Sequence, residues 1–320
     1  MLHRLLEHRA TWALGFAVIL ASCTTLVEVD LPDATPQGVM EASVRLGEPP
    51  VVILTTTQGY FDPVDLSTLN DLFVGDAEVT CTVDGVTVPL PALCTGDLPP
   101  EALDAAADFL GFDPEVLANA EFCVYTGFAA PETYGEVGKQ YQIQALWSDS
   151  VQSYDLTASA SLRPLPALDS VWFDIPESST NDSLGLIWTQ FTDPVGFGNA
   201  YRWSSKRENV GEDFFYPLGS VFDDVFVDGL TFPFSNFRSP QPGVEETPGE
   251  EGFWKVGDTV VVRMEAIDYE VFEVLRDFEN SVANQGNPFA LPTSASTTVD
   301  GGLGWFAAYS GVTDTVVCAP

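Results

Sequence analysis

Residues 79–90 read VTCTVDGVTVPL and carry a clear β-hairpin signature. Apolar and polar residues alternate over its first five positions, which is typical of a strand with one buried face. Asp84-Gly85 supplies a two-residue turn of the kind that joins antiparallel strands, and the chain returns after it. The pattern predicts a β-hairpin in which Cys81 shares the core face with the valines on either side.

Segments with the same strand chemistry, separated by Gly, Pro, Asn and Asp, continue on both sides of this hairpin. A second hairpin is expected in which residues 222–227 pair with residues 230–234 across Asp228-Gly229. The spacing of the strands favours a mainly β fold with two β-sandwich-like, immunoglobulin-like domains. Further strands are expected at residues 39–46, 51–57, 122–125, 140–147, 153–161, 169–175, 184–191, 199–206 and 259–267, and within 301–317.

Two stretches follow a helical period instead. Apolar residues at helical spacing predict a short helical insert at about residues 98–120, and one helix at about residues 268–284 that begins at Asp268. The connector at residues 163–166 is stiff because each of its two prolines fixes φ. The expected domains are therefore residues 37–163, which contain the insert, and residues 164–320.

The chain begins with the anatomy of a signal peptide: a short polar start, an apolar run over residues 11–21 and small residues before Cys23. That run is much shorter than the about 20 residues that a bilayer-spanning helix needs. Leu20-Ala21-Ser22-Cys23 has the form of a bacterial lipoprotein processing site. It predicts removal of residues 1–22, acyl chains on Cys23 as a membrane anchor, and a tether at residues 23–36. The alternative is an ordinary secretory signal in which Cys23 is present by chance.

Both histidines of the chain, His3 and His8, lie in the expected leader. The mature chain therefore has no imidazole for a Ser-His-Asp or Cys-His pair, or for the usual histidine-bearing zinc sites. The full chain has 12 basic and 47 acidic residues and a net charge of −35, which becomes −36 once Arg4, Arg9 and Glu7 leave with the leader. This charge disfavours binding of nucleic acid and favours binding of cations. It also suits a salt-rich medium, where salt screens the repulsion between like charges.

Four cysteines remain after Cys23, an even number that indicates one or two disulfides in an exported protein. Three pairings are open at this stage. The sequence contains no Cys-x-x-Cys pair, which argues against a metal site built from four thiolates. The four residues are Cys81, Cys94, Cys123 and Cys318.

Asp223, Asp224 and Asp228 offer hard oxygen ligands beside the second expected hairpin turn, and calcium is the cation that such ligands suit. The competing interpretation is that Asp228-Gly229 is only a turn and that the neighbouring acids are solvated. The twelve-residue spacing of an EF-hand is missing from the sequence, which favours this second interpretation. No other cofactor is expected.

Trp147, Trp254 and Trp305 lie near expected turns or strand ends, which makes them the candidate ligand-contact aromatics. The competing interpretation is that they fill the cores. Paired carboxylates could also serve glycoside hydrolysis, but among so many acids some suitable pair is inevitable by chance. No catalytic residue is therefore predicted.

Several phrases of the sequence are distinctive as a set: LPALDSVWF at 165–173, FTDP at 191–194 leading to NAYRW at 199–203, FDD at 222–224 through DG at 228–229, GNPF at 286–289, GGLGWF at 301–306 and AYS at 308–310. As a set they resemble the Bacteroidetes outer-membrane lipoproteins of the domain of unknown function 4249 family. The resemblance implies an outer-membrane lipoprotein of two β-rich domains, often found beside TonB-dependent transporters. It supplies no catalytic residue.

The sequence therefore predicts a non-enzymatic lipoprotein at the outer membrane, with its membrane face left open. Its expected role is as an accessory or ligand-capturing partner of a TonB-dependent receptor. One alternative is a surface structural or adhesive module, and another is a carboxylate-based glycoside hydrolase. Exposed aromatic patches would favour the partner role, whereas uniformly acidic faces would favour the structural module.

Overall fold

The computed structural model describes residues 35–59, 70–99, 123–165, 167–177, 179, 181–239, 247–284 and 296–320. Contacts divide the chain between Thr35 and Pro36, and the architecture below belongs to the unit that runs from Pro36 to Pro320. The leader, Cys23 and nearly all of the helical insert expected at residues 98–120 lie outside the described residues.

The mainly β fold is confirmed, with the strands arranged in sandwich-like layers. The strands are β1 (Gly38–Arg45), β2 (Val51–Thr56), β3 (Glu78–Val83), β4 (Val86–Pro89), β5 (Ala92–Cys94), β6 (Cys123–Thr126), β7 (Gln140–Ser148), β8 (Ser153–Ser161), β9 (Ser170–Asp174), β10 (Leu184–Thr192), β11 (Ala200–Arg207), β12 (Val221–Asp223), β13 (Thr231–Asn236), β14 (Trp254–Lys255), β15 (Thr259–Ile267) and β16 (Leu303–Val317). The helical elements are α5 (Tyr269–Ala283) and the single turns η1 (Thr95–Asp97), η2 (Pro131–Thr133) and η3 (Glu208–Val210).

The hairpin expected at residues 79–90 is confirmed, because β3 and β4 pair with Val83 opposite Val86. Asp84 and Gly85 have φ values of +50° and +80°, the left-handed geometry that a two-residue hairpin turn requires. β3 also pairs with β7, and β7 with β8, so the hairpin forms one edge of a four-stranded sheet ordered β4-β3-β7-β8.

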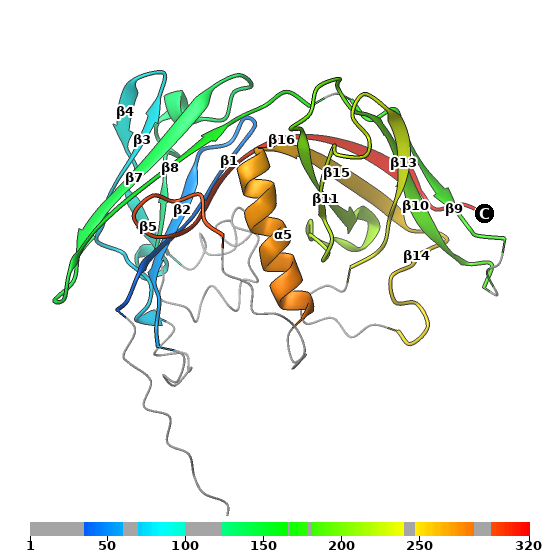
Figure 1. The fold of residues 1–320 in the computed structure, drawn as a ribbon. Coiled ribbons are helices and arrows are strands. Elements are labelled where there is room, and N and C mark those ends of the chain that lie inside the picture. The colour runs from blue at the N-terminus through cyan, green and yellow to red at the C-terminus, as the bar shows by residue number, and fades with distance from the viewer. Residues whose placement is uncertain are drawn as a thin grey trace, which may run out of the picture. The chain divides into compact units, whose positions relative to one another are not determined.

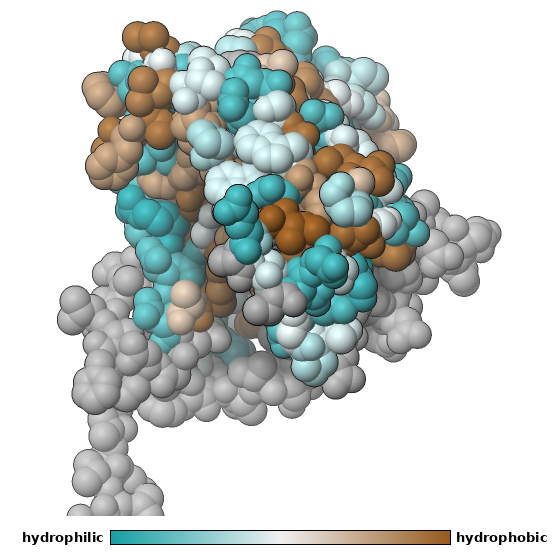
Figure 2. Space-filling view, turned by 90° about the vertical axis from the view of Figure 1, so that its right-hand side faces the viewer, coloured by the Kyte–Doolittle hydropathy of each residue, from teal (hydrophilic) through white to brown (hydrophobic). Residues whose placement is uncertain are grey.

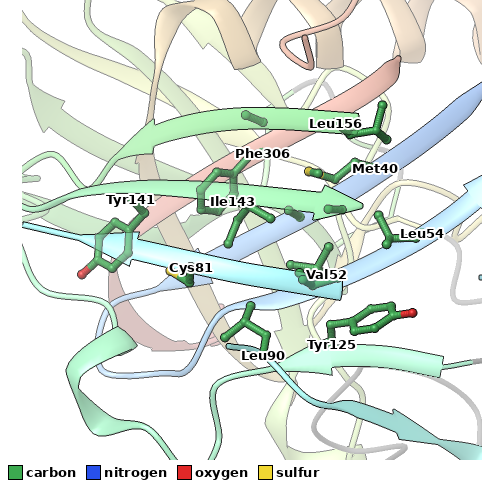
Figure 3. Close-up of a cluster of buried hydrophobic side chains, with 14 of the residues drawn as sticks. Met40, Val52, Leu54, Cys81, Leu90, Tyr125, Tyr141, Ile143, Leu156 and Phe306 are labelled. Carbon is green, nitrogen blue, oxygen red and sulfur yellow. The ribbon is translucent and has the colours of Figure 1, made fainter. Parts of the chain in front are cut away.

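This four-stranded sheet packs face to face on β1, β2 and the first half of β16. Figure 3 shows the resulting core, in which Cys81 and Ile143 from one sheet meet Met40, Leu54 and Phe306 from the other. All five side chains are completely buried. Burial of one large apolar side chain contributes about 1.5–3 kcal/mol relative to its exposure, so this core is a main source of stability.

The last strand, β16, joins the two halves of the fold. Its residues 303–309 pair in parallel with β1, and its residues 310–317 pair antiparallel with β15. The result is one eight-stranded sheet ordered β12-β11-β15-β16-β1-β2-β6-β5, and Figure 1 labels its strands β11, β15, β16, β1, β2 and β5. The division expected at residue 163 stays a prediction, because β16 comes from the second expected domain yet completes the sheet of the first.

A second sandwich lies at the other end of the long sheet. Its smaller sheet is ordered β13-β10-β14, with β9 also paired to β10. Ile187 and Phe191 of β10 pack against Val262 and Met264 of β15. Even-numbered residues of β16 reach both cores, so both smaller sheets cover the same face of the long sheet.

The helix expected at residues 268–284 is confirmed as α5, which packs on the opposite face of the long sheet (Figure 1). Asp268 occupies the N-cap position, but its side chain does not cap the helix. Its carboxylate instead accepts hydrogen bonds from the Ser161 amide at 2.7 Å and the Arg163 Nε at 2.8 Å. The aspartate therefore ties the start of α5 to the end of β8.

The hairpin expected between residues 222–227 and 230–234 is wrong. β12 pairs with β11 and β13 pairs with β10, so the two strands belong to different sheets. The segment between them turns on itself, because the amides of Val227 and Asp228 both donate to the Asp224 carbonyl at 2.9 Å. Side-chain carboxylates bind further amides of this region and its neighbouring loop, as described below, so no ladder forms across Asp228-Gly229.

Cys94 and Cys123 form a disulfide between β5 and β6, at directly opposed positions of the ladder. Cys81 lies in the first core and Cys318 in the second, and both are buried free thiols. Of the two disulfides that the cysteine count allows, the structure therefore contains one. Because it closes a segment with a sequence separation of 29, loop entropy gives it a stabilising effect of about 3–4 kcal/mol.

Candidate functional site

Two loops of the second sandwich are joined by aspartate side chains. Residues 193–199 link β10 to β11, and residues 224–230 link β12 to β13; together they are called the paired loops. Carboxylate oxygens of Asp193, Asp224 and Asp228 all lie within 4.8 Å of one another. Asp193 and Asp224 are buried, and Asp228 is half-buried.

Each of these carboxylates accepts hydrogen bonds from backbone amides of the opposite loop. The contacts are Asp224 with Gly198 (3.2 Å) and Asn199 (2.8 Å), Asp228 with Gly196 (2.5 Å), and Asp193 with Gly229 (3.1 Å). A hydrogen bond to a charged group contributes about 1.5–3 kcal/mol. The aspartates therefore hold the backbones of the two loops against each other.

The calcium ligands expected from the sequence are only partly brought together. Asp224 and Asp228 are in the cluster, but the Asp223 carboxylate lies by the Tyr269 hydroxyl at 3.3 Å, and Asp193 takes its place. Sequence spacing could not find Asp193, because it belongs to the other loop. Three carboxylates are fewer than the about six to eight oxygens that calcium takes. Calcium therefore stays a prediction.

The paired loops present large apolar side chains to solvent. The five are Val195 and Phe226, each 90 % exposed, Phe197, 76 %, Leu230, 55 %, and Val225, 50 %. A Cβ added to Gly229 would lie 3.0 Å from Val195 Cγ2, so the two loops touch. Figure 2 shows that hydrophobic side chains gather in patches on one side of the molecule, which is therefore not uniformly acidic. Grouped exposed apolar side chains are typical of an interaction surface.

Phe226 also borders an aromatic hollow of about 450 Å³. Its walls include Trp203, Phe232, Phe234 and Phe237. Protruding apolar side chains thus lie beside an apolar recess. A surface of this shape can interlock with a complementary partner surface, which gives the core of a protein interface its close packing.

A second recess, of about 300 Å³, lies against β1, β2 and β16 and is called the arginine pocket. Glu41 and Arg45 of β1 line it, and both alternate with residues that face the first core. Trp305 and Tyr309 of β16 lie directly beside them in the parallel ladder. The pocket is therefore on the face of the long sheet that the sandwich cores do not use.

Arg45 and Arg202 form one end of the arginine pocket. Arg45 pairs with Glu265 and donates to the Tyr216 hydroxyl at 2.8 Å. Arg202 donates to the Tyr309 hydroxyl at 3.1 Å, and its guanidinium carbon lies 3.6 Å from the centroid of the Tyr216 ring. Burial lowers the pKa of both arginines, but the tyrosines, and Glu265 beside Arg45, raise it by more, so both stay charged.

Glu41 lies at the other end of the pocket, opposite Trp305 in the ladder. Among the residues that the structure describes, none donates a hydrogen bond to its carboxylate or pairs with it. Glu41 is an exposed residue of β1, and the partial desolvation of its carboxylate beside the sheet raises the pKa of Glu41. The Trp305 ring also lies beside the ring of Phe278 of α5, with 6.2 Å between the ring centroids.

Of the three tryptophans expected as ligand contacts, only Trp305 borders one of these recesses. Trp147 is buried in the first core, stacked on Tyr154 at a centroid distance of 4.5 Å. Trp254 is also buried, and its indole N–H donates to the Asn236 carbonyl at 2.8 Å. Both lie near strand ends as expected, but layers from distant parts of the chain cover them.

No known protein-family model matches this chain, and no curated protein matches it either. The resemblance to the lipoprotein family therefore depends on the quoted phrases alone. Among the residues that the structure describes, no helix has both the length and the apolar character needed to cross a bilayer.

Proposed function

We propose that the mature protein is a non-enzymatic lipoprotein, held at the outer membrane by acyl chains on Cys23, that docks on a TonB-dependent transporter as an accessory or ligand-capturing partner. The observation that carries this proposal is the set of five exposed apolar side chains on the paired loops. It favours the partner role over a uniformly hydrated structural or adhesive module.

The paired loops suit docking because they are ordered before any partner arrives. The carboxylates of Asp193, Asp224 and Asp228 already hold the loop backbones through the amides of the opposite loop. Ordering a flexible side chain on binding costs about 0.5–1.5 kcal/mol, and ordering a loop adds to that cost. Because the backbones of the paired loops are already held together, binding avoids most of the cost of ordering them.

The charge of the paired loops indicates what kind of surface they fit. Residues 193–199 and 224–230 include three aspartates and contain no lysine or arginine. Anionic lipid headgroups are repelled by such a segment, whereas basic side chains are attracted to it. The proposed docking partner therefore offers an apolar groove bordered by lysine or arginine.

Photocrosslinking tests the proposal in native membranes. A benzoylphenylalanine replaces Phe226 in the full-length lipidated protein, and a second variant carries it in place of Val86, which is 59 % exposed in the first sandwich. The expected result is a covalent adduct with an outer-membrane transporter from position 226 and none from position 86. Mass spectrometry of the adduct identifies the partner and the contacted groove.

Two further observations complete this test. The double variant Phe197→Ser and Phe226→Ser should fold normally and lose transporter recovery by about tenfold or more, since interface anchors of this kind carry most of the binding energy. Adducts of position 226 with lipid alone, with a second copy of this chain alone, or at the same level as position 86 would each overturn the proposal.

A further inference from the structure

We infer that the arginine pocket binds a small zwitterion whose ammonium and carboxylate groups are several ångströms apart, a class that includes short peptides with free ends. This inference extends the ligand-capturing part of the proposed function. Its test uses the purified protein alone, so its outcome does not depend on whether a transporter partner exists.

The Glu41 end of the pocket fits the ammonium group. The Glu41 carboxylate lines the recess, belongs to an exposed residue and has no hydrogen-bond or ion-pair partner among the described residues, so a ligand can reach it. An accessible carboxylate without a partner attracts a cation, and a bound ammonium donates charge-assisted hydrogen bonds to it. Trp305, next to Glu41 in the ladder, adds an aromatic face that attracts cations.

The Arg202 end fits the carboxylate group. The hydrogen-bond partners of Arg202 are the neutral hydroxyls of Tyr309 at 3.1 Å and Ser220 at 3.4 Å. Glu279 also attracts this arginine electrostatically, but its carboxylate accepts a hydrogen bond from the Ser220 hydroxyl at 2.5 Å and makes no ion pair with the guanidinium. Arg45, by contrast, is already paired with Glu265. A guanidinium whose direct hydrogen-bond partners are neutral keeps its attraction for an incoming carboxylate.

The spacing of the two ends favours ligands whose charges are well separated. Arg45 contacts Tyr216 and Tyr309, the same tyrosines that contact Arg202. Arg45 is four residues from Glu41 on β1, so at about 3.3 Å per residue about 13 Å separates the Cα atoms of Glu41 and Arg45. Both side chains reach into the same recess, which brings the charges of a bound ligand closer together than that. A free α-amino acid carries both charges on one carbon, whereas a longer zwitterion can place one charge at each end of the recess. The volume of about 300 Å³ is at the small end of ligand pockets.

The net charge of the chain explains why the two ends must act together. A strongly negative protein attracts cations everywhere on its surface, so a cation alone would find many weak sites. Of the 12 basic residues in the chain, two line this one pocket. A ligand that needs both a guanidinium and a carboxylate is therefore bound selectively by this pocket, whereas the overall negative charge of the protein attracts any cation.

The test measures binding of 6-aminohexanoate to the mature lipidated protein in detergent, with ¹⁵N-labelled tryptophan and the Trp305 indole signal assigned from Trp305→Phe. Hexylamine and hexanoate, which each carry one of the two charges on a chain of the same length, are the matched probes. The zwitterion is expected to shift the Trp305 signal with a Kd at least about tenfold lower than either, because it gains a second charged hydrogen bond. The indole of Trp172, which is 37 % exposed on β9, should not shift.

Variants separate the two ends of the pocket. Glu41→Gln should bring the Kd for 6-aminohexanoate to that for hexanoate, and Arg202→Gln to that for hexylamine, whereas Arg202→Lys should keep most of the preference. Thermal melting checks that each variant folds. If Arg202→Gln does not fold, the result with Glu41→Gln alone decides the question. The inference is overturned if hexylamine or hexanoate binds as tightly as the zwitterion, or if none of the three moves the Trp305 signal at millimolar concentration.

Discussion

The Glu265 carboxylate on β15 is paired with the Arg45 guanidinium on β1, although the two residues are 220 positions apart in the sequence. The Glu265 side chain is only 2 % exposed, and the Tyr216 hydroxyl donates to its second oxygen. β1 lies in the half of the long sheet that forms the first sandwich, and β15 lies in the half that forms the second. The ion pair therefore joins the two halves of the long sheet across β16, on the face that carries the arginine pocket.

Glu265→Gln should be strongly destabilising, because it leaves the Arg45 charge without its partner. Removing one member of a buried ion pair costs about 3–5 kcal/mol, and urea unfolding followed by circular dichroism measures the loss. The double variant Arg45→Met and Glu265→Leu removes both charges and should lose less than Glu265→Gln alone. If the double variant is the less stable of the two, the pair itself contributes a net stabilisation and the expectation is wrong.

Asp224→Ala should loosen the paired loops, because it leaves the amides of Gly198 and Asn199 without their acceptor. Two unsatisfied amides predict a loss of about 2–4 kcal/mol in the free energy of unfolding. Hydrogen exchange should show that amides of residues 196–199 lose protection. The matched control is Asp223→Ala, whose carboxylate makes only long hydrogen bonds of 3.3 and 3.4 Å and should cost less than about 1 kcal/mol.

Calcium at Asp193, Asp224 and Asp228 is tested by thermal melting. If the native state binds calcium there, the melting temperature rises with calcium concentration by mass action and falls with a chelator. Asp228→Asn should then lose this calcium dependence while keeping its fold. A melting temperature that is the same in calcium and in chelator would show that these loops do not bind calcium.

Cys81 and Cys318 should resist alkylation in the folded protein. Burial raises the pKa of each thiol to about 12, so at neutral pH almost none of either residue is the reactive thiolate. Iodoacetamide followed by mass spectrometry should find both unmodified in buffer and modified in denaturant. Cys94 and Cys123 should react only after reduction, because they share the disulfide. Rapid labelling of Cys81 in the native protein would contradict its place in the first core.

Glu41→Gln should stabilise the protein at neutral pH. Burial raises the pKa of Glu41 above its ordinary value of 4.5, so in the window between the unfolded and folded pKa values the folded protein binds more protons than the unfolded chain. Stability is then lost as pH rises through that window. The variant should match the wild type at low pH and exceed it at pH 7, measured by urea unfolding at several pH values. Glu78→Gln, at a glutamate on β3 that is exposed as Glu41 is, is the control and should show no such gain.

Local patterns predicted much of this fold. The first hairpin was predicted from the alternation and the Asp-Gly turn at residues 79–90, and α5 from the helical period after Asp268. Both predictions succeeded because hairpins and amphipathic helices depend on neighbours within a few residues. The same reasoning failed at Asp228-Gly229. There the turn residues are present, but carboxylates of the paired loops bind the nearby amides. A local sequence pattern does not reveal these competing hydrogen bonds.

The strand chemistry, the placement of both histidines in the expected leader and the shortage of basic residues follow from the sequence. Which distant residues meet is visible only in the folded chain: Asp193 with Asp224, Cys94 with Cys123, and Glu41 with Trp305 beside Arg202. Period and composition are properties of short segments, whereas these contacts depend on β16 pairing with β1 on one side and β15 on the other. Such pairing is fixed by the fit of whole sheets and not by any single stretch of chain.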